Sequence, residues 1–215
     1  MTENLFEAQY DITRKSKLRK FYEENKFSIF LTTLILLIGL VSFSFYLEIR
    51  DNKKTLLADN YIEAKIYLEN GQRDKAENIL KKIILENDST YSTLSLFLML
   101  KENFEKDQKE LLKLFDHVLK NNKFEKEVKN LIIFKKALFL SSFESETEML
   151  EALKLLINGD SLWKPHALLL LGDYFFSKDE YLKAREFYSK VLTLKGLHKE
   201  LYEQARSQIV LTIDE

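Results

Sequence analysis

The strongest pattern of apolar residues in the chain lies near its N-terminus. The run from Phe27 to Leu47 contains no Asp, Glu, Lys or Arg, and two-thirds of its positions are Leu, Ile, Phe or Val. A helix of this length is about 30 Å long, which matches the hydrocarbon core of a bilayer. The run therefore predicts a transmembrane helix over residues 27–47.

Two other interpretations of this run are a buried core helix and a cleaved signal peptide. A soluble core helix of this length usually carries at least one charge. A signal peptide has a shorter apolar region that ends in small residues, whereas bulky Phe45, Tyr46 and Leu47 end this run. We therefore expect a retained membrane anchor.

The basic residues around the run predict its orientation. Six Lys or Arg lie in the segment before it (12–26), and three lie in the segment of equal length after it (48–62). Because cytoplasmic flanks carry the excess of positive charge, we expect a cytoplasmic N-terminus. The predicted domains are a basic cytoplasmic tail at 1–26, the transmembrane helix at 27–47 and a soluble domain at 48–215 across the membrane.

After residue 47 the apolar residues recur at helical spacing, and no segment alternates with the period of a strand. Gly71 and Pro165 mark helix boundaries, and Gly196 is expected to close the eighth helix. The sequence thus predicts an all-α fold, whose short connections favour helical hairpins stacked as a solenoid. The nine expected helices lie at 57–68, 74–86, 92–105, 110–120, 128–142, 146–157, 165–177, 180–194 and 198–211.

The helices expected at 165–177 and 180–194 have the clearest packing pattern. Gly172 and Ala184 are small where two helices would cross closely, and large residues flank them. This spacing resembles the tetratricopeptide repeat over about 165–198, with Gly196 where that repeat usually has Pro. The resemblance implies degenerate tetratricopeptide-like hairpins. The residues expected to pack this pair are Leu168, Leu171, Gly172, Phe175, Ala184, Tyr188 and Val191.

A weaker copy of the pattern lies earlier in the chain, at 61–84, where Asn60 and Glu63 depart from the apolar residues expected. Between the two copies, residues 92–157 keep hairpin-like spacing but lack the small residues, so we expect degenerate repeats there. An irregular helical bundle is the alternative. The packing residues of the early copy are Ala64, Tyr67, Ala76, Leu80 and Ile83.

Composition argues against catalysis and nucleic-acid binding. The formal net charge is −1, there is no Cys, and His117, His166 and His198 are too far apart for a helical metal pair. The five Gly form no phosphate-binding loop, and the acidic residues are scattered. We therefore expect no enzyme activity, metal, cofactor, small-molecule substrate or nucleic acid. A hydrolase or transferase with an unrecognised site is the alternative.

In tetratricopeptide repeats the first helix of each pair lines a groove, which takes an extended peptide or a partner helix. The resemblance therefore implies a protein partner for this chain. Ordinary surface or contact between repeats is the other interpretation of the same residues. The candidate groove residues are Lys65, His166, Leu169, Asp173 and Phe176.

The layout of the whole chain is similar to that of the YfgM-like family. The resemblance is carried by the anchor at 27–47, the hairpin at 61–84 and the segment from Trp163 to Arg185. Asp179 stands where this family commonly has Gly, so the resemblance does not fix the geometry of this turn. Members of the family are bacterial inner-membrane proteins described as ancillary subunits of the SecYEG translocon.

This resemblance implies a periplasmic domain beside the Sec translocon. Such a domain would associate with membrane-anchored chaperones and assist translocated proteins. The alternative function is a scaffold of another cell-envelope complex, for division or cell-wall assembly.

The predicted anchor can be tested by washing purified membranes. The chain should stay in the membrane pellet after high salt and after alkaline carbonate, because an apolar helix is held by the hydrocarbon core rather than by charge. A variant without residues 1–47 should be released by the same washes. Release of the intact chain by either wash would show that the run does not cross the membrane.

Overall fold

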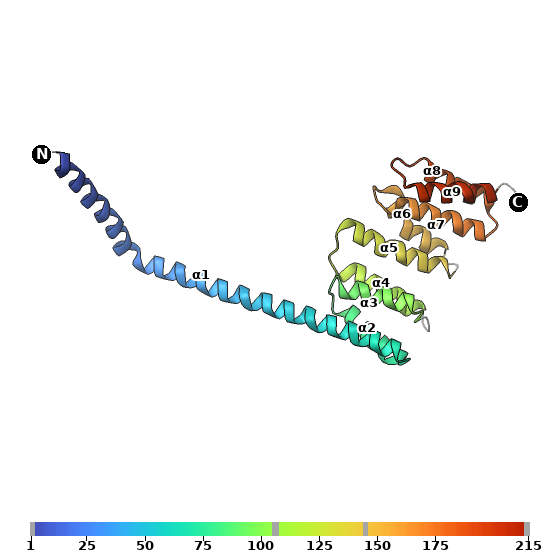
Figure 1. The fold of residues 1–215 in the computed structure, drawn as a ribbon, viewed down its shortest axis with the longest axis horizontal. Coiled ribbons are helices and arrows are strands. Elements are labelled where there is room, and N and C mark those ends of the chain that lie inside the picture. Colours follow the sequence, from blue (N-terminus) through green and yellow to red (C-terminus); the bar gives the residue numbers. More distant parts are fainter. Residues whose placement is uncertain (1–2, 105–107, 144–145, 213–215) are drawn as a thin grey trace. The chain divides into compact units, whose positions relative to one another are not determined.

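The computed structural model describes residues 3–104, 108–143 and 146–212, with side chains from Arg19 onward. These residues form helices and turns, with no strand among them, so the predicted all-α fold class is confirmed. The chain divides into two compact units, Met1–Leu56 and Leu57–Glu215. The helices are α1 (Glu3–Glu69), α2 (Arg73–Leu85), α3 (Tyr91–Lys101), α4 (Gln108–Asn121), α5 (Lys126–Ser141), α6 (Glu146–Asn158), α7 (Lys164–Ser177), α8 (Tyr181–Leu192) and α9 (Lys199–Leu211) (Figure 1).

Most helix boundaries lie within two residues of those expected, but α1, the end of α3 and the residue that closes α8 differ in ways that matter. The segments 27–47 and 57–68, predicted as separate helices, both belong to α1, because no Pro or Gly interrupts the helix-forming residues between them. Helix α3 ends at Lys101, before Asn103 adopts a φ of 50°. Helix α8 ends at Leu192, so Gly196, with a φ of 68°, belongs to the following turn and does not close the helix.

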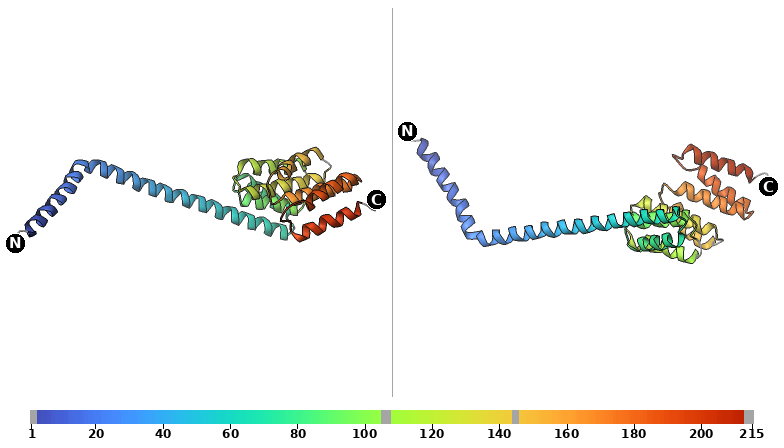
Figure 2. Two further views of the ribbon diagram at one scale, coloured as in Figure 1. Left: turned by 90° about the horizontal axis from the view of Figure 1, so that it is seen from above. Right: turned by 60° about the horizontal axis from the view of Figure 1, so that its bottom comes forward.

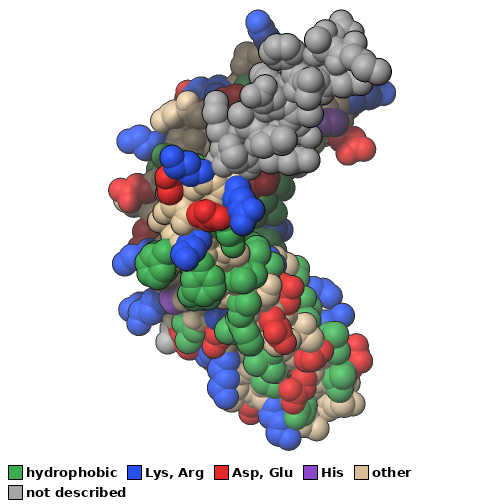
Figure 3. All heavy atoms as spheres, turned by 90° about the vertical axis from the view of Figure 1, so that its left-hand side faces the viewer, with side chains coloured by type: hydrophobic (Ala, Val, Ile, Leu, Met, Phe, Trp, Pro, Cys, Tyr) green, Lys and Arg blue, Asp and Glu red, His purple; other side chains and the backbone are tan. Residues whose placement is uncertain are grey.

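In the first unit, α1 contains one window long and apolar enough to cross a membrane. Its mean hydropathy is 2.3, and none of the window is buried against the rest of the chain. The hydroxyl groups of Thr32 and Thr33 donate hydrogen bonds to the carbonyls of Ser28 and Ile29, at 2.8 and 2.9 Å, which satisfies them inside the helix. Large apolar side chains remain exposed at the surface (Figure 3).

In the second unit, helices neighbouring in sequence pack against one another. The closest partners are α7 with α8, α5 with α6, α2 with α3 and α8 with α9 (Figure 2). Two apolar clusters fill the spaces between them. Helix α5 contributes Ile132 to the N-terminal cluster and Ala137 to the C-terminal one, so it joins the two halves of the core.

The residues expected to pack the two repeat copies lie inside this unit. Eleven of the twelve are buried, and Tyr67 is half-buried. Gly172 lies against the ring of Tyr188, so closely that a side-chain carbon at position 172 would overlap the ring. In the early copy, Ala64 and Leu80 occupy the corresponding places and are both fully buried. Compared with Gly172 and Tyr188, the early copy has a larger residue on its first helix and a smaller one on its second, so the two sizes compensate.

The turns that follow α1 and α7 share one geometry. Gly71 has a φ of 72°, its N–H donates to Leu68 at 3.0 Å, and the N–H of Gln72 donates to Tyr67 at 2.8 Å. Asp179 has a φ of 61°, and the N–H groups of positions 179 and 180 make the equivalent pair of bonds. The turn at Asp179 therefore has the same geometry as the turn at Gly71. This double bond is the Schellman motif, which satisfies carbonyls at the end of a helix.

The matched sizes of residues 172 and 188 predict a coupled effect on stability. Gly172→Ala should lower the free energy of unfolding by about 1–3 kcal/mol through overpacking. Tyr188→Leu should lower it by about 2–4 kcal/mol through the space it leaves. The double variant copies the Ala64 and Leu80 arrangement. Its loss of unfolding free energy should be smaller than the sum of the two single losses by at least about 1 kcal/mol.

The measurement is urea unfolding of the chain in detergent micelles, followed by the fluorescence of its one tryptophan, Trp163. Because Trp163 precedes α7, its signal reports on this hairpin. Losses that simply add in the double variant would contradict the proposed contact.

Candidate functional site

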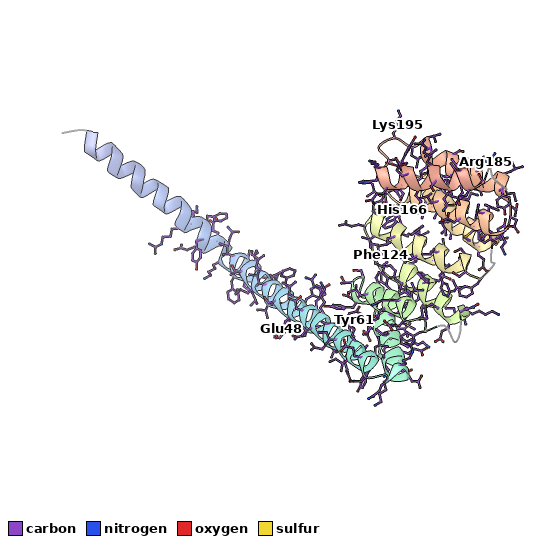
Figure 4. All side chains as sticks on the ribbon, turned by 45° about the vertical axis from the view of Figure 1, so that its right-hand side comes forward. Glu48, Tyr61, Phe124, His166, Arg185 and Lys195 are labelled. Atoms are coloured by element: carbon purple, nitrogen blue, oxygen red, sulfur yellow. The ribbon has the colours of Figure 1, made fainter. Side chains whose placement is uncertain are left out.

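A cleft of about 950 Å³ opens on the described part of the repeat domain. It lies between the start of α5, the α6–α7 connection, the start of α7 and the α8–α9 connection. His166 and Lys195, from two of these segments, are labelled in Figure 4. Its lining includes the apolar residues Val128, Leu131, Leu162, Trp163, Pro165, Leu194, Leu197 and Leu201 and the charged residues Glu127, Asp160, Lys164 and Lys195.

The wall formed by the α6–α7 connection is held in place by Glu127. Its carboxylate accepts hydrogen bonds from the Ser161 hydroxyl at 3.1 Å and from the Leu162 N–H at 3.0 Å. Its backbone carbonyl accepts a hydrogen bond from the indole N–H of Trp163 at 3.1 Å. Leu162 nevertheless remains 76% exposed, so the connection presents an apolar side chain to solvent.

Trp163 and His166 line the cleft beside this wall, and the ring of Phe134 contacts both of them. Phe134 stacks on Trp163 with ring centroids 5.6 Å apart, and the His166 ring lies 5.3 Å from Trp163. The Nδ1 atom of His166 is buried and has no hydrogen-bond partner among the described residues. Burial lowers the pKa of His166, and the charge of nearby His198 lowers it further. The cleft therefore favours neutral His166.

A smaller hollow of about 340 Å³ lies between α3 and α5. Apolar side chains form most of its lining, and two lysines, Lys101 and Lys135, stand beside them. No carboxylate lines this hollow among the described residues. The other lining residues are Phe97, Leu100, Leu138, Phe139 and Ser142.

One face of α5 runs from the cleft to the smaller hollow. Val128 and Leu131 line the cleft, and Lys135, Leu138 and Ser142 line the hollow. These five residues follow one another at steps of three and four, so the four inside α5 lie on one side of the helix, and Ser142, its C-cap, continues that side. We call them the α5 stripe. Val128 and Leu138 are 42% and 40% exposed.

The five groove residues expected from the sequence do not come together in either hollow. His166 lines the cleft, whereas Leu169 is only 4% exposed and belongs to the core. Asp173 is exposed on α7, Phe176 is half-buried, and Lys65 is exposed on α1. Whether any of the five contacts a partner stays a prediction.

Asp173 has a structural partner of its own. Its carboxylate accepts a hydrogen bond from the Tyr188 hydroxyl at 2.8 Å. Although the residue as a whole is exposed, partial burial of this carboxylate raises the pKa of Asp173, and the hydrogen bond from Tyr188 opposes that rise. Burial also raises the pKa of Tyr188, followed by the hydrogen bond to Asp173 and the charge of that residue. This pair therefore ties α7 to α8 beside the Gly172 contact.

Sequence reasoning missed most of the residues around the two hollows. The sequence marks Trp163 only as part of the family resemblance, and it places the α5 stripe among degenerate repeats. The available signal was Val128, Leu131 and Leu138, which are apolar at helical spacing outside the set that forms the core. Among the described residues, no group of three or more His, Asp or Glu is placed to hold a metal ion.

Comparison with known families gives a match to the tetratricopeptide repeat-like domain over residues 19–209. No curated protein matches the chain, and neither does any solved structure. The match thus includes the apolar part of α1 as well as the repeat domain.

The environment of His166 predicts an acid-sensitive contribution to stability. Because its pKa is lowered by folding, the folded chain binds this proton less tightly than the unfolded chain. The free energy of unfolding should therefore fall as the pH drops through about 6.5, the ordinary pKa of His. One group contributes at most about 1.4 kcal/mol per pH unit, and less here because the ring keeps contact with solvent.

We expect His166→Gln to lose less stability than the parent chain between about pH 7.5 and about pH 5.5. The measurement is urea unfolding at both pH values. His198→Gln should have a smaller effect in the same direction, because it removes only the weaker cause of the shift. An unchanged pH dependence in His166→Gln would contradict this account.

Proposed function

The chain belongs to the tetratricopeptide repeat-like domain family, and we propose that it is a single-pass membrane protein whose repeat domain binds other proteins beside the membrane. The observation that carries this proposal is the family match over residues 19–209, which joins the apolar helix to the repeats. Stacked helical repeats of this kind act as interaction modules, because they present extended surfaces rather than deep reaction sites. The proposed role is accordingly not enzymatic.

The proposed location is the bacterial inner membrane, with residues 1–26 in the cytoplasm and residues 48–215 in the periplasm. The excess of basic residues before the apolar run supports this orientation. The proposed partner is the SecYEG translocon, together with membrane-anchored chaperones. Its support is the similarity to the YfgM-like family in the anchor and in the hairpins at 61–84 and 163–185.

A membrane anchor suits a module of this kind for a physical reason. Tethering confines the domain to a thin layer beside the membrane, so a weak contact is populated at a high effective concentration. The cleft and the smaller hollow are open to solvent rather than enclosed, as expected for a surface that contacts another protein. The tether and the surface would therefore act together.

Co-purification with SecYEG tests this proposal. The full chain should be recovered with the translocon from detergent-solubilised membranes, whereas a variant without residues 1–47 should lose most of that recovery. A third variant carries an unrelated apolar helix of equal length in place of 27–47, and it should recover the complex if the tether acts through concentration alone.

Equal recovery with and without the anchor would contradict the tethering role. Recovery of division or cell-wall proteins in place of the translocon, identified after crosslinking, would support a different envelope scaffold. Recovery of no protein partner by any anchored variant would overturn the interaction role itself.

A further inference from the structure

The α5 stripe is an apolar helix face that the described part of the chain leaves partly open. Ile132, Ala137 and Leu140 cover the other sides of α5 with core contacts and are 2% exposed or less. Val128 and Leu138, on the stripe, keep about two-fifths of their surface exposed, at 42% and 40%. A hollow lies at each end of this face, one formed with α7 and the α8–α9 connection and the other with α3.

Charge is distributed unevenly along the stripe. At the α3–α5 end, Lys101 and Lys135 line the hollow, and no carboxylate of the described residues lines it. At the cleft end, Lys164 and Lys195 are balanced by Glu127 and Asp160. The stripe is therefore positive at one end and close to neutral, with exposed Leu162, at the other. An occupant would place carboxylates over Lys101 and Lys135.

The length and chemistry of the stripe select a helix. From Val128 to Ser142 the stripe spans about 21 Å, which is four turns of a helix. An extended peptide would need donors and acceptors for its backbone along this path, and the stripe offers apolar and lysine side chains. A helix satisfies its own backbone and presents apolar residues at steps of three and four.

We propose that the α5 stripe and its two hollows bind an amphipathic helix of about four turns in a partner protein, whose apolar face lies on Val128, Leu131 and Leu138 and whose acidic residues lie over Lys101 and Lys135. This assignment rests on the proposed function, because it names the partner chemistry of the same repeat surface. A flat lipid surface with anionic headgroups matches the lysines but does not fill the hollows at the two ends of the stripe.

The test uses the full chain in nonionic detergent and three fluorescent peptides, each long enough for four helical turns. The first peptide has Leu at helical spacing flanked by Glu, the second has Lys in place of Glu, and the third has the first composition in scrambled order. We expect binding of the first peptide in the micromolar range, by fluorescence anisotropy, and at least about tenfold weaker binding of the other two.

Charge-reversed variants locate the bound peptide. The double variant Lys101→Glu with Lys135→Glu should bind the acidic peptide at least about tenfold more weakly and the basic peptide more tightly. The matched control is Lys82→Glu with Lys199→Glu, which changes the net charge equally at exposed positions of α2 and α9. Leu138→Asp should weaken binding of the acidic peptide. Leu182→Asp, which changes a residue of α8 that is 82% exposed, should leave that binding unchanged. Circular dichroism checks that each variant is folded.

Several outcomes would overturn the assignment. These are absence of binding by the acidic peptide up to about 1 mM, equal binding of all three peptides, and equal losses in the test and control variants. A shift to dimers that depends on Leu138 would indicate a second copy of the chain as the occupant and would also overturn it. Failure here with retained translocon recovery would leave the proposed function in place and remove only this site.

Discussion

Close approach between paired helices is the constraint on which the repeat domain depends, and the contact between Gly172 and Tyr188 shows it most sharply. The ring of Tyr188 fills the space that a side chain at position 172 would occupy, and it is fully buried. Its hydroxyl reaches Asp173 at the edge of the same interface. One contact thus sets the separation of α7 and α8 and places a polar pair at its rim. The C-terminal cluster continues from this interface through α5 and α6.

The same architecture persists where the sequence of the repeat does not. The turns after α1 and α7 have equivalent hydrogen bonds, although one has Gly71 and the other Asp179 at the left-handed position. Asn103 has a φ of 50° after α3, and the N–H of Phe104 there donates to Met99, as its counterpart does in the turn after α1. Asp and Asn tolerate this conformation better than other residues with side chains. Turn geometry is therefore kept while the residues change, which makes the repeats hard to recognise.

Much of the fold follows from periodicity, since a helix that buries one face repeats apolar residues at steps of three and four. Helices α2 to α9 lie close to their expected ranges for that reason. The continuity of α1 could not be read in the same way, because residues 48–56 are mostly polar and carry no apolar face. Residues 48–56 are helical because of their helix propensity and because no Pro or Gly interrupts them, and neither property produces a periodic pattern of apolar residues.

The site was less accessible to sequence reasoning, because it depends on how many neighbours each helix has. Helix α7 contacts α5, α6, α8 and α9, so even Leu169 and Leu170 are covered. Helix α5 is also rich in apolar residues, yet Val128 and Leu138 stay exposed on the side between α3 and α7. A sequence states that both residues are apolar, but only the arrangement of neighbours shows which face is left open.

An exposed apolar face is a liability unless something limits self-association. In the α5 stripe, Lys135 and Ser142 interrupt the apolar residues, and Lys101 faces the same hollow from α3. Such charges weaken any self-contact that places the two lysine ends together, and they strengthen contact with an acidic partner. The proposed tether would remove the need for a larger apolar area, since local concentration would supply part of the occupancy. On the proposed anchored domain, a small, positively edged stripe would combine selective binding of an acidic partner with little self-association.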